Sequence, residues 1–225
     1  MATHLENAKE LKKKFDVKNA AEEFALAFKE DNDSVEAAGN AGLCYMMLGE
    51  LKKASEFFKN ALKINSSDEL VALYISMIDV ALGKEYVDPK MKNNDISVAE
   101  QFMTTAEMLF SIDMKEESFR LFEAILKDVN DDEWINLASN QYRIVAMLAR
   151  FNFFDEATSI AQSLVDENPK AWQGYASLAQ IELEKDNIVD AKAMFKQAIL
   201  LGGDKEPLVV AAIADARLLK LEDKK

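Results

Sequence analysis

A spacing of 34 residues that recurs along the chain constrains its fold more than any other feature. The same residue types return at this interval, first as Ala20, Phe24 and Ala27 and then as Ala54, Phe58 and Ala61. Nearer the C-terminus the interval relates two further sets, Ala157, Ala161 and Leu164, and Ala191, Phe195 and Ala198. Within each set the spacings of three and four residues place the side chains on one face of a helix. An apolar helical face that returns at a fixed interval indicates stacked structural repeats.

The stretch from Val35 to Asp68 shows one complete unit of this pattern. Small residues and a tyrosine share one face of a first helix, at Ala38, Ala41, Gly42 and Tyr45. Gly49 then interrupts the pattern, and a second apolar stripe follows at Leu51, Ala54, Phe57, Phe58, Ala61 and Leu62. Two helices joined by so short a turn fold back antiparallel to each other.

This unit resembles the tetratricopeptide repeat, which has the same length and the same order of small residues, tyrosine, alanine and phenylalanine. The resemblance implies an all-α protein, an α-solenoid of about five helix–turn–helix repeats. A residue that tolerates left-handed backbone angles, followed by an apolar residue, is expected at each turn between paired helices. Three such pairs are present: Gly49 with Leu51, Asn152 with Phe154, and Asp186 with Ile188.

Outside the central unit, caps and apolar stripes predict the remaining helices. They are expected at residues 5–14, 16–29, 68–82, 97–110, 115–127, from the acidic run at 131–133 to 150, and at 154–165, 171–184, 189–200 and 207–221. Ser97 with Glu100 has the spacing of a capping box. The final helix, which begins at Pro207, is expected to cover the exposed end of the array.

Residues 84–96 interrupt the repeat, because Pro89, Asn93, Asn94 and Asp95 leave no sustained helical stripe. We expect a loop or irregular insert here, dividing N-terminal repeats at 1–83 from C-terminal repeats at 97–225. A short helix around residues 86–91 that lets the array continue is the alternative.

Composition agrees with this fold and excludes several functions. The chain is 49% hydrophobic and contains only 7 Gly and 3 Pro, which favours long helices. The net charge of −13 would repel nucleic acids and anionic membranes. No apolar run approaches the roughly 20 residues that span a bilayer, and the N-terminal residues lack an apolar signal core, so we expect a cytoplasmic location and no membrane insertion.

No catalytic or metal-binding motif is present. His4 is the only histidine and Cys44 the only cysteine, so neither a histidine-based nucleophile system nor a structural zinc site is indicated. Phosphate-binding glycine motifs are missing from the sequence. We therefore expect no enzyme activity, no cofactor and no metal.

By resemblance to the family, the first helix of each repeat lines a concave groove that receives a partner. The proposed apolar contacts are Leu43, Met46, Met47, Leu73 and Met77, with Tyr142 and Arg150 as weaker polar contacts. Methionine adapts to varied side chains, so such a groove suits an apolar protein segment. The same residues at helical spacing would also suit a buried core. The family's carboxylate-binding pattern is matched only at Asn40.

The predicted function is a non-enzymatic protein-interaction module, an adaptor or chaperone-like protein that binds a peptide or protein segment. Two alternatives remain open at this stage. The chain could assemble with itself as a homo-oligomeric scaffold, or it could close around a small effector ligand.

Overall fold

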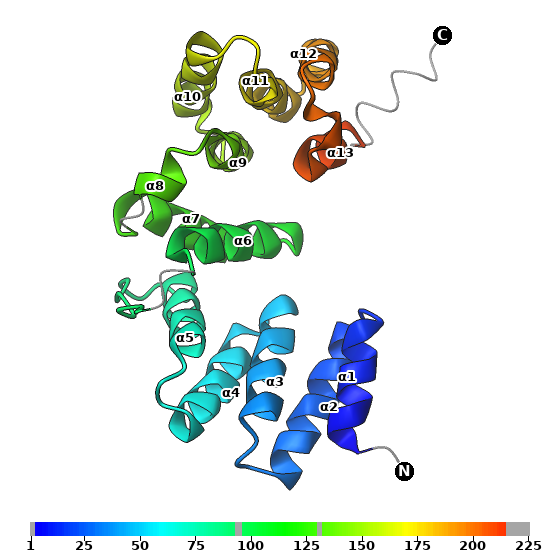
Figure 1. The fold of residues 1–225 in the computed structure, drawn as a ribbon, viewed down its shortest axis with the longest axis vertical. Coiled ribbons are helices and arrows are strands. Elements are labelled where there is room, and N and C mark those ends of the chain that lie inside the picture. The colour runs from blue at the N-terminus through cyan, green and yellow to red at the C-terminus, as the bar shows by residue number, and fades with distance from the viewer. Residues whose placement is uncertain (1–2, 93–95, 130–131, 215–225) are drawn as a thin grey trace. The chain divides into compact units, whose positions relative to one another are not determined.

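The computed structural model describes residues 3–92, 96–129 and 132–214, and within these ranges the regular structure is helical, with no strand (Figure 1). The chain forms two compact units, Met1–Asp131 and Asp132–Lys225. The helices of the first unit are α1 (His4–Lys13), α2 (Val17–Glu30), α3 (Val35–Met47), α4 (Leu51–Ile64), α5 (Glu69–Ala81), α6 (Val98–Ser111) and α7 (Lys115–Lys127). Those of the second unit are α8 (Asp132–Ile135), α9 (Ala138–Arg150), α10 (Phe154–Glu167), α11 (Trp172–Glu184), α12 (Ile188–Leu200) and α13 (Pro207–Ile213), with a 3₁₀ turn at Gly203–Lys205.

Ten of the helices in the described residues pair as antiparallel hairpins, in agreement with about five repeats. The pairs are α1–α2, α3–α4, α6–α7, α9–α10 and α11–α12. Each pair is joined by a turn with one left-handed residue, and the second helix begins two residues later. These residues are Phe15 (φ 59°), Gly49 (φ 73°), Asp113 (φ 65°), Asn152 (φ 66°) and Asp186 (φ 63°). The three predicted turn pairs are confirmed, and Phe15 and Asp113 extend the rule to the other two hairpins.

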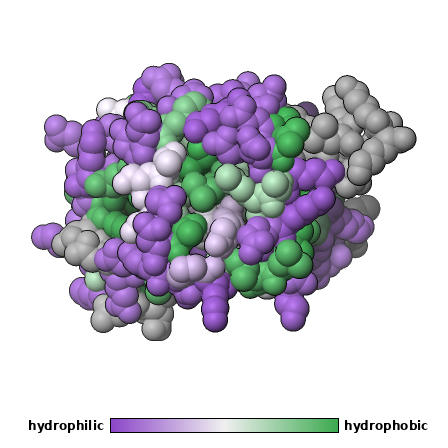
Figure 2. All heavy atoms as spheres, turned by 90° about the horizontal axis from the view of Figure 1, so that it is seen from above, coloured by the Kyte–Doolittle hydropathy of each residue, from purple (hydrophilic) through white to green (hydrophobic). Residues whose placement is uncertain are grey.

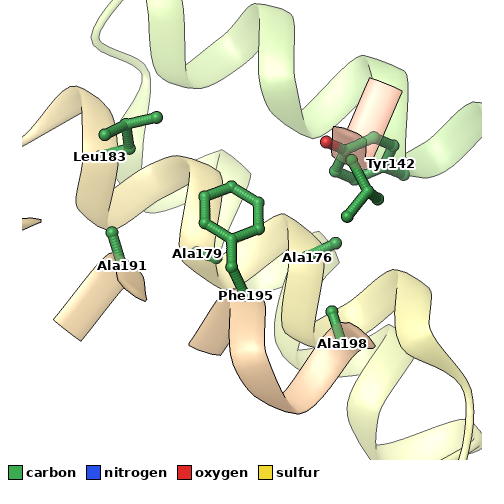
Figure 3. Packing of buried hydrophobic residues seen from close by; sticks show 8 residues of the cluster. Tyr142, Ala176, Ala179, Leu183, Ala191, Phe195 and Ala198 are labelled. Carbon is green, nitrogen blue, oxygen red and sulfur yellow. The ribbon is translucent and has the colours of Figure 1, made fainter. Parts of the chain in front are cut away.

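The repeated alanine and phenylalanine positions form the cores of the hairpins. In the first unit, Phe24 and Phe58 are fully buried. A Cβ atom on Gly42 would lie 2.7 Å from the Phe58 ring, so the small residue permits the close approach of α3 and α4. Figure 3 shows the equivalent packing in the second unit, where Phe195 of α12 lies against α11. The alanine and phenylalanine positions that recur every 34 residues are therefore the residues that pack each helix pair together.

The sequence predicted one continuous helix up to Arg150, and this prediction is wrong. The chain instead forms α8, breaks at residues 136–137, and begins α9 at Ala138. The amide of Asn140 donates to the carbonyl oxygen of Trp134 at 2.9 Å, and Leu137 is extended at the start of α9. An asparagine side chain that binds nearby backbone in this way competes with helical hydrogen bonding.

The C-terminal helix is shorter in the described residues than predicted. The helix α13 begins at Pro207, as expected, and ends at Ile213. It contacts α12 and buries Val209, which belongs to the core of the second unit. The predicted continuation over 215–221 lies outside the described residues.

The third repeat contains only its first helix, α5. Gly83 has a left-handed φ of 85° and stands 34 residues after Gly49, yet residues 84–92 form no helix. The register explains this, because Glu85, Asp88 and Lys92 occupy the places of the buried residues Leu51, Ala54 and Phe58. Charged side chains there could not be buried against α5 without a large desolvation cost.

The predicted insert lies within the first unit, and the compact units divide further along the chain, after Asp131. The helical alternative for 86–91 is wrong, because these residues are irregular. The rest of the predicted insert includes 93–95, which lie outside the described residues. The division of the repeats into an N-terminal and a C-terminal set at this insert remains a prediction.

After this irregular segment, α6 and α7 run crosswise to α5 in the view of Figure 1. The aromatic ring of Tyr86 packs edge-on against Phe102 of α6, with 5.6 Å between centroids. Burial raises the pKa of Tyr86 to about 12. Arg120 of α7 donates to the backbone oxygen of Ala81 at 2.9 Å, at the end of α5. These contacts place α6 and α7 against α5.

At the other end of the unit, His4 joins α1 to α2. Its Nδ1 lies 2.7 Å from Glu23 Oε2, and its Nε2 lies 3.5 Å from Glu30 Oε1. The hydrogen bond to Glu23 raises the pKa of His4 above its ordinary 6.5, with a further contribution from the charge of Glu30 and an opposing one from desolvation.

We expect this contact to stabilise the fold at low pH. A group whose pKa is raised on folding contributes stability that is complete below its unfolded pKa and is lost as the pH rises through its folded pKa. Histidine NMR titration should therefore give a pKa above 6.5, and His4→Gln should remove the stability change over that pH window. A His4 pKa at or below 6.5 would contradict the observed contact.

Candidate functional site

The polar and exposed side chains that α1 and α3 share form the candidate site, here called the inner face. It comprises Lys9, Lys12, Glu36, Gly39, Asn40, Leu43 and Met47. Two contacts join the helices: Lys9 Nζ lies 2.8 Å from Glu36 Oε1, and Lys12 Nζ donates to Asn40 Oδ1 at 2.6 Å. Asn40 also donates to the backbone oxygen of Glu36 at 2.9 Å. The inner face is therefore one continuous surface across two repeats.

Apolar side chains remain accessible on the α3 part of the inner face. Met47 is 43% exposed, and Leu43 one turn earlier is half-buried. A Cβ atom added to Gly39 would meet no other atom within 4 Å, so the surface is open above this helix. An apolar side chain from a partner could contact Leu43 and Met47 and remove both from water.

The α1 part of the inner face is basic, although the chain is strongly acidic overall. Lys9 and Lys12 point to α3, and Lys13 and Lys14 follow at the end of the helix. Lys9 pairs with Glu36 across the two helices, and Lys13 pairs with Glu10 of α1 at 2.7 Å, whereas Asn40, the partner of Lys12, carries no charge. Exposed ion pairs of this kind contribute little stability, so these lysines can exchange their partners for the carboxylates of a bound segment.

The cysteine next to this surface takes no part in it. Cys44 is buried, and desolvation raises the pKa of its thiol. Both properties reduce its nucleophilic reactivity. Its interpretation as a small hydrophobic core residue fits this position.

Three of the predicted groove residues are core residues in the structure. Leu73 and Met77 of α5 have no exposed surface, and Met46 of α3 is also buried. The hydroxyl of Thr105 on α6 donates to Met77 Sδ at 3.7 Å, so α6 covers the side of α5 that the groove would have used. A partner cannot reach Leu73 or Met77 in this conformation. Of the predicted apolar groove residues, only Leu43 and Met47 are accessible, and their role as partner contacts stays a prediction.

The two predicted polar contacts lie in the second unit. Tyr142 of α9 is buried, and its ring packs edge-on against Trp172 at 5.5 Å between centroids. Arg150, at the end of α9, is half-buried, and its Nη1 lies 3.7 Å from Met147 Sδ. Tyr142 is therefore part of the core of the second unit. The role of Arg150 as a partner contact stays a prediction.

Sequence reasoning did not assign the lysines of α1 to the site. They were interpreted as an ordinary solvated face, because charge alone does not say what a helix faces. The 34-residue register was the available signal, since it aligns Lys9 with Leu43 and Lys13 with Met47. Residues at aligned positions of stacked repeats lie on the same side of the array.

Comparison with solved structures shows the tetratricopeptide-repeat fold. A tetratricopeptide repeat protein from Parabacteroides merdae aligns with 95% of this chain and 80% of its own, at 17% identity and a TM-score of 0.51. YrrB, described as a TPR protein with an unusual peptide-binding site, aligns over 85% of this chain and 98% of its own, at 17% identity and a TM-score of 0.41. The protein TTC0263 from Thermus thermophilus aligns over 96% and 97%, at 16% identity and a TM-score of 0.39.

Searches at the sequence level add nothing to this result, since no family model and no curated protein matched. No helix in the described part of the chain has the length and apolar character needed to cross a membrane. On the face shown in Figure 2, hydrophobic residues are interspersed among hydrophilic ones.

Proposed function

We propose that this chain, which has the tetratricopeptide-repeat fold, is a non-enzymatic adaptor or chaperone-like protein whose inner face binds a segment of another protein. The observation that carries the proposal is the open surface of α1 and α3, where the accessible Leu43 and Met47 lie beside Lys9 and Lys12. Helical surfaces of stacked repeats can recognise a peptide through a few apolar anchors and flanking charges.

The chemistry of the inner face selects its partner. An apolar side chain would pack on Leu43 and Met47 of α3, while carboxylates beside it would pair with the lysines of α1. A segment that combines hydrophobic and acidic residues satisfies both requirements. Charge complementarity of this kind contributes to specificity and to the rate of association.

The test replaces Met47, which is exposed, and therefore leaves the fold intact. We expect Met47→Glu to weaken the capture of the partner from a lysate of the source organism by about tenfold or more, because a carboxylate replaces an apolar contact and repels an acidic segment. Quantitative mass spectrometry of proteins captured on the immobilised intact chain measures the loss.

Val189→Glu is the matched control. Val189 is an exposed apolar residue of α12 in the second unit, 71% exposed, so the same chemical change is made at a residue that is not part of the inner face. Equal capture by both variants and the intact chain would remove the inner face from the proposed function.

A further inference from the structure

The third repeat lacks its second helix, and this leaves one face of α5 open. In the second repeat the equivalent face of α3 consists of Ala38, Ala41, Gly42 and Tyr45. All four are buried, and α4 contacts this face through Phe58 at Gly42 and Phe57 at Tyr45. The corresponding residues 34 positions later on α5 are Ala72, Ile75, Ser76 and Asp79, here called the open face. All four remain partly exposed.

The neighbours of α5 cover its other sides. Phe58 of α4 stacks on Tyr74 at 5.1 Å between centroids, and Thr105 of α6 contacts Met77. The helix α7 also contacts α5, where Arg120 donates to the Ala81 carbonyl at the C-terminal end of α5. The place that a second helix takes in the other repeats is therefore left without one among the described residues.

The irregular segment 84–92 contacts the open face at Ser76 and Asp79 and leaves Ala72 and Ile75 partly exposed. It runs back along α5, because Ser76 Oγ donates to the backbone oxygen of Val87 at 2.9 Å and the Lys92 amide donates to Glu69 Oε2 at 3.0 Å. Lys84 pairs with Asp79 at 2.7 Å, which neutralises the acidic residue of the open face. Val87 itself remains largely exposed. A single extended segment covers less of α5 than a helix would.

A recess of about 350 Å³ lies at the end of α5, where the missing helix would begin. It is lined by residues of three segments: Gly49, Glu50, Leu51, Lys52, Lys53, Leu82 and Met114. In the second repeat, α4 begins at the equivalent position, and its first residue, Leu51, is buried. The recess has room for an apolar side chain at the start of a docked helix.

The side of α4 next to the position of the missing helix is basic. On α4, Phe57 faces the preceding repeat, since it contacts Phe28 of α2 at 6.0 Å, and Phe58 faces α5. Beyond Phe58, on the side away from Phe57, one helical face carries three exposed lysines, Lys52, Lys59 and Lys63, and one exposed carboxylate, Glu56. In the described part of the chain, Lys52 and Lys59 have no carboxylate partner. This face borders the vacant position.

We propose that the open face of α5 docks an amphipathic helix of a partner protein, with an apolar stripe of small and aromatic residues and an acidic flank. The helix would lie where a second helix lies in the other repeats, its stripe on Ala72 and Ile75 and its carboxylates toward Lys52 and Lys59. The equivalent helices α2 and α4 have 14 residues, which sets the length of the docked segment. This surface is separate from the inner face and does not depend on it.

The chain supplies a probe for this site in its own α2. A fluorescent synthetic peptide of residues 16–31 carries Ala20, Phe24 and Ala27 on one face, with five acidic and two basic residues. We expect it to bind the full chain in the micromolar range by fluorescence anisotropy. Ile75→Arg should weaken binding about tenfold or more, because it places a long cationic side chain on the open face.

A second variant tests the charge complementarity of the site without changing the packing at Ile75. Lys52→Glu with Lys59→Glu changes two exposed side chains and should also weaken binding about tenfold, with a steeper loss at low salt. The matched control is Lys170→Glu with Lys196→Glu, which makes the same charge change on exposed lysines of the second unit. Met47→Glu should leave the peptide affinity unchanged, which separates this site from the inner face.

The proposal is overturned if the peptide shows no binding up to about 1 mM, or if Ile75→Arg and the Lys52→Glu, Lys59→Glu chain both bind it as tightly as the original chain. Equal losses in the Lys170→Glu, Lys196→Glu control would overturn it too, because they would show non-specific charge attraction. Circular dichroism of each variant confirms that the helices remain folded.

Discussion

Met77→Glu is expected to destabilise the first unit strongly, by about 4 kcal/mol or more. The side chain of Met77 is fully buried between α5 and α6, and no cation lies against it to pair with a carboxylate among its described contacts. Burying an unpaired charge costs about 4 kcal/mol or more, which is a large part of the roughly 5–15 kcal/mol that stabilises a domain. Urea unfolding followed by circular dichroism measures the loss.

Met47→Glu makes the same chemical change at an exposed position and serves as the control. We expect it to alter the free energy of unfolding by no more than about 0.5 kcal/mol, as is usual for surface substitutions. Equal stability of the two variants would mean that Met77 is accessible and that α6 does not cover it. The comparison therefore distinguishes a core at α5 from a groove at α5.

Phe195→Ala is expected to destabilise the second unit by about 3–5 kcal/mol, because it removes a large buried ring and leaves a cavity. Phe195 is 2% exposed and lies against Ala176, Ala179 and Leu183 of α11, between Ala191 and Ala198 of its own helix (Figure 3). The short side chains of the surrounding alanines cannot fill this cavity.

Hydrogen–deuterium exchange locates this effect. Faster exchange is expected in α11 and α12, with α3 and α4 unchanged, because these helices belong to different compact units. Leu200→Ala removes an apolar side chain that is 79% exposed and should have almost no effect. An equal effect of the two variants would contradict the packing of α12 on α11.

The fold followed from the sequence where the repeat register was intact. Ala54, Phe58 and Ala61 of one helix, and their equivalents elsewhere, have side chains that must be buried, and their spacing leaves only one arrangement of paired helices. Gly49, Asn152 and Asp186 were identified at the turns because few residues adopt left-handed angles without strain. Phe15 was missed for the same reason, since an aromatic residue is uncommon in that conformation.

The path of the chain after α5 could not be predicted in the same way. Leu73 and Met77 are apolar at helical spacing, and such a stripe fits a ligand groove and a core equally well. The direction in which α6 returns decides between them, and residues 84–92 carry no periodicity that would indicate it. The charges at Glu85, Asp88 and Lys92 were the usable signal, because they exclude a buried helix at that place.

The break between α8 and α9 also depends on a local competition. The side-chain amide of Asn140 donates to the Trp134 carbonyl, and the sequence around it contains Asn136 and Ser139, which favour caps and turns over helix interiors. One helix was predicted because the acidic run at 131–133 suits a helix N-terminus. The hydrogen bond of Asn140 instead accompanies a second helix start, at Ala138.

Site-specific photo-crosslinking tests the central claim most directly, that the inner face of α1 and α3 binds a protein segment. A photoreactive phenylalanine analogue would replace Met47, and, as the control, Lys18, an exposed residue of α2. The proposed function predicts a crosslinked partner from Met47 in a lysate of the source organism and none from Lys18. The same products from both positions, or none from Met47, would contradict it.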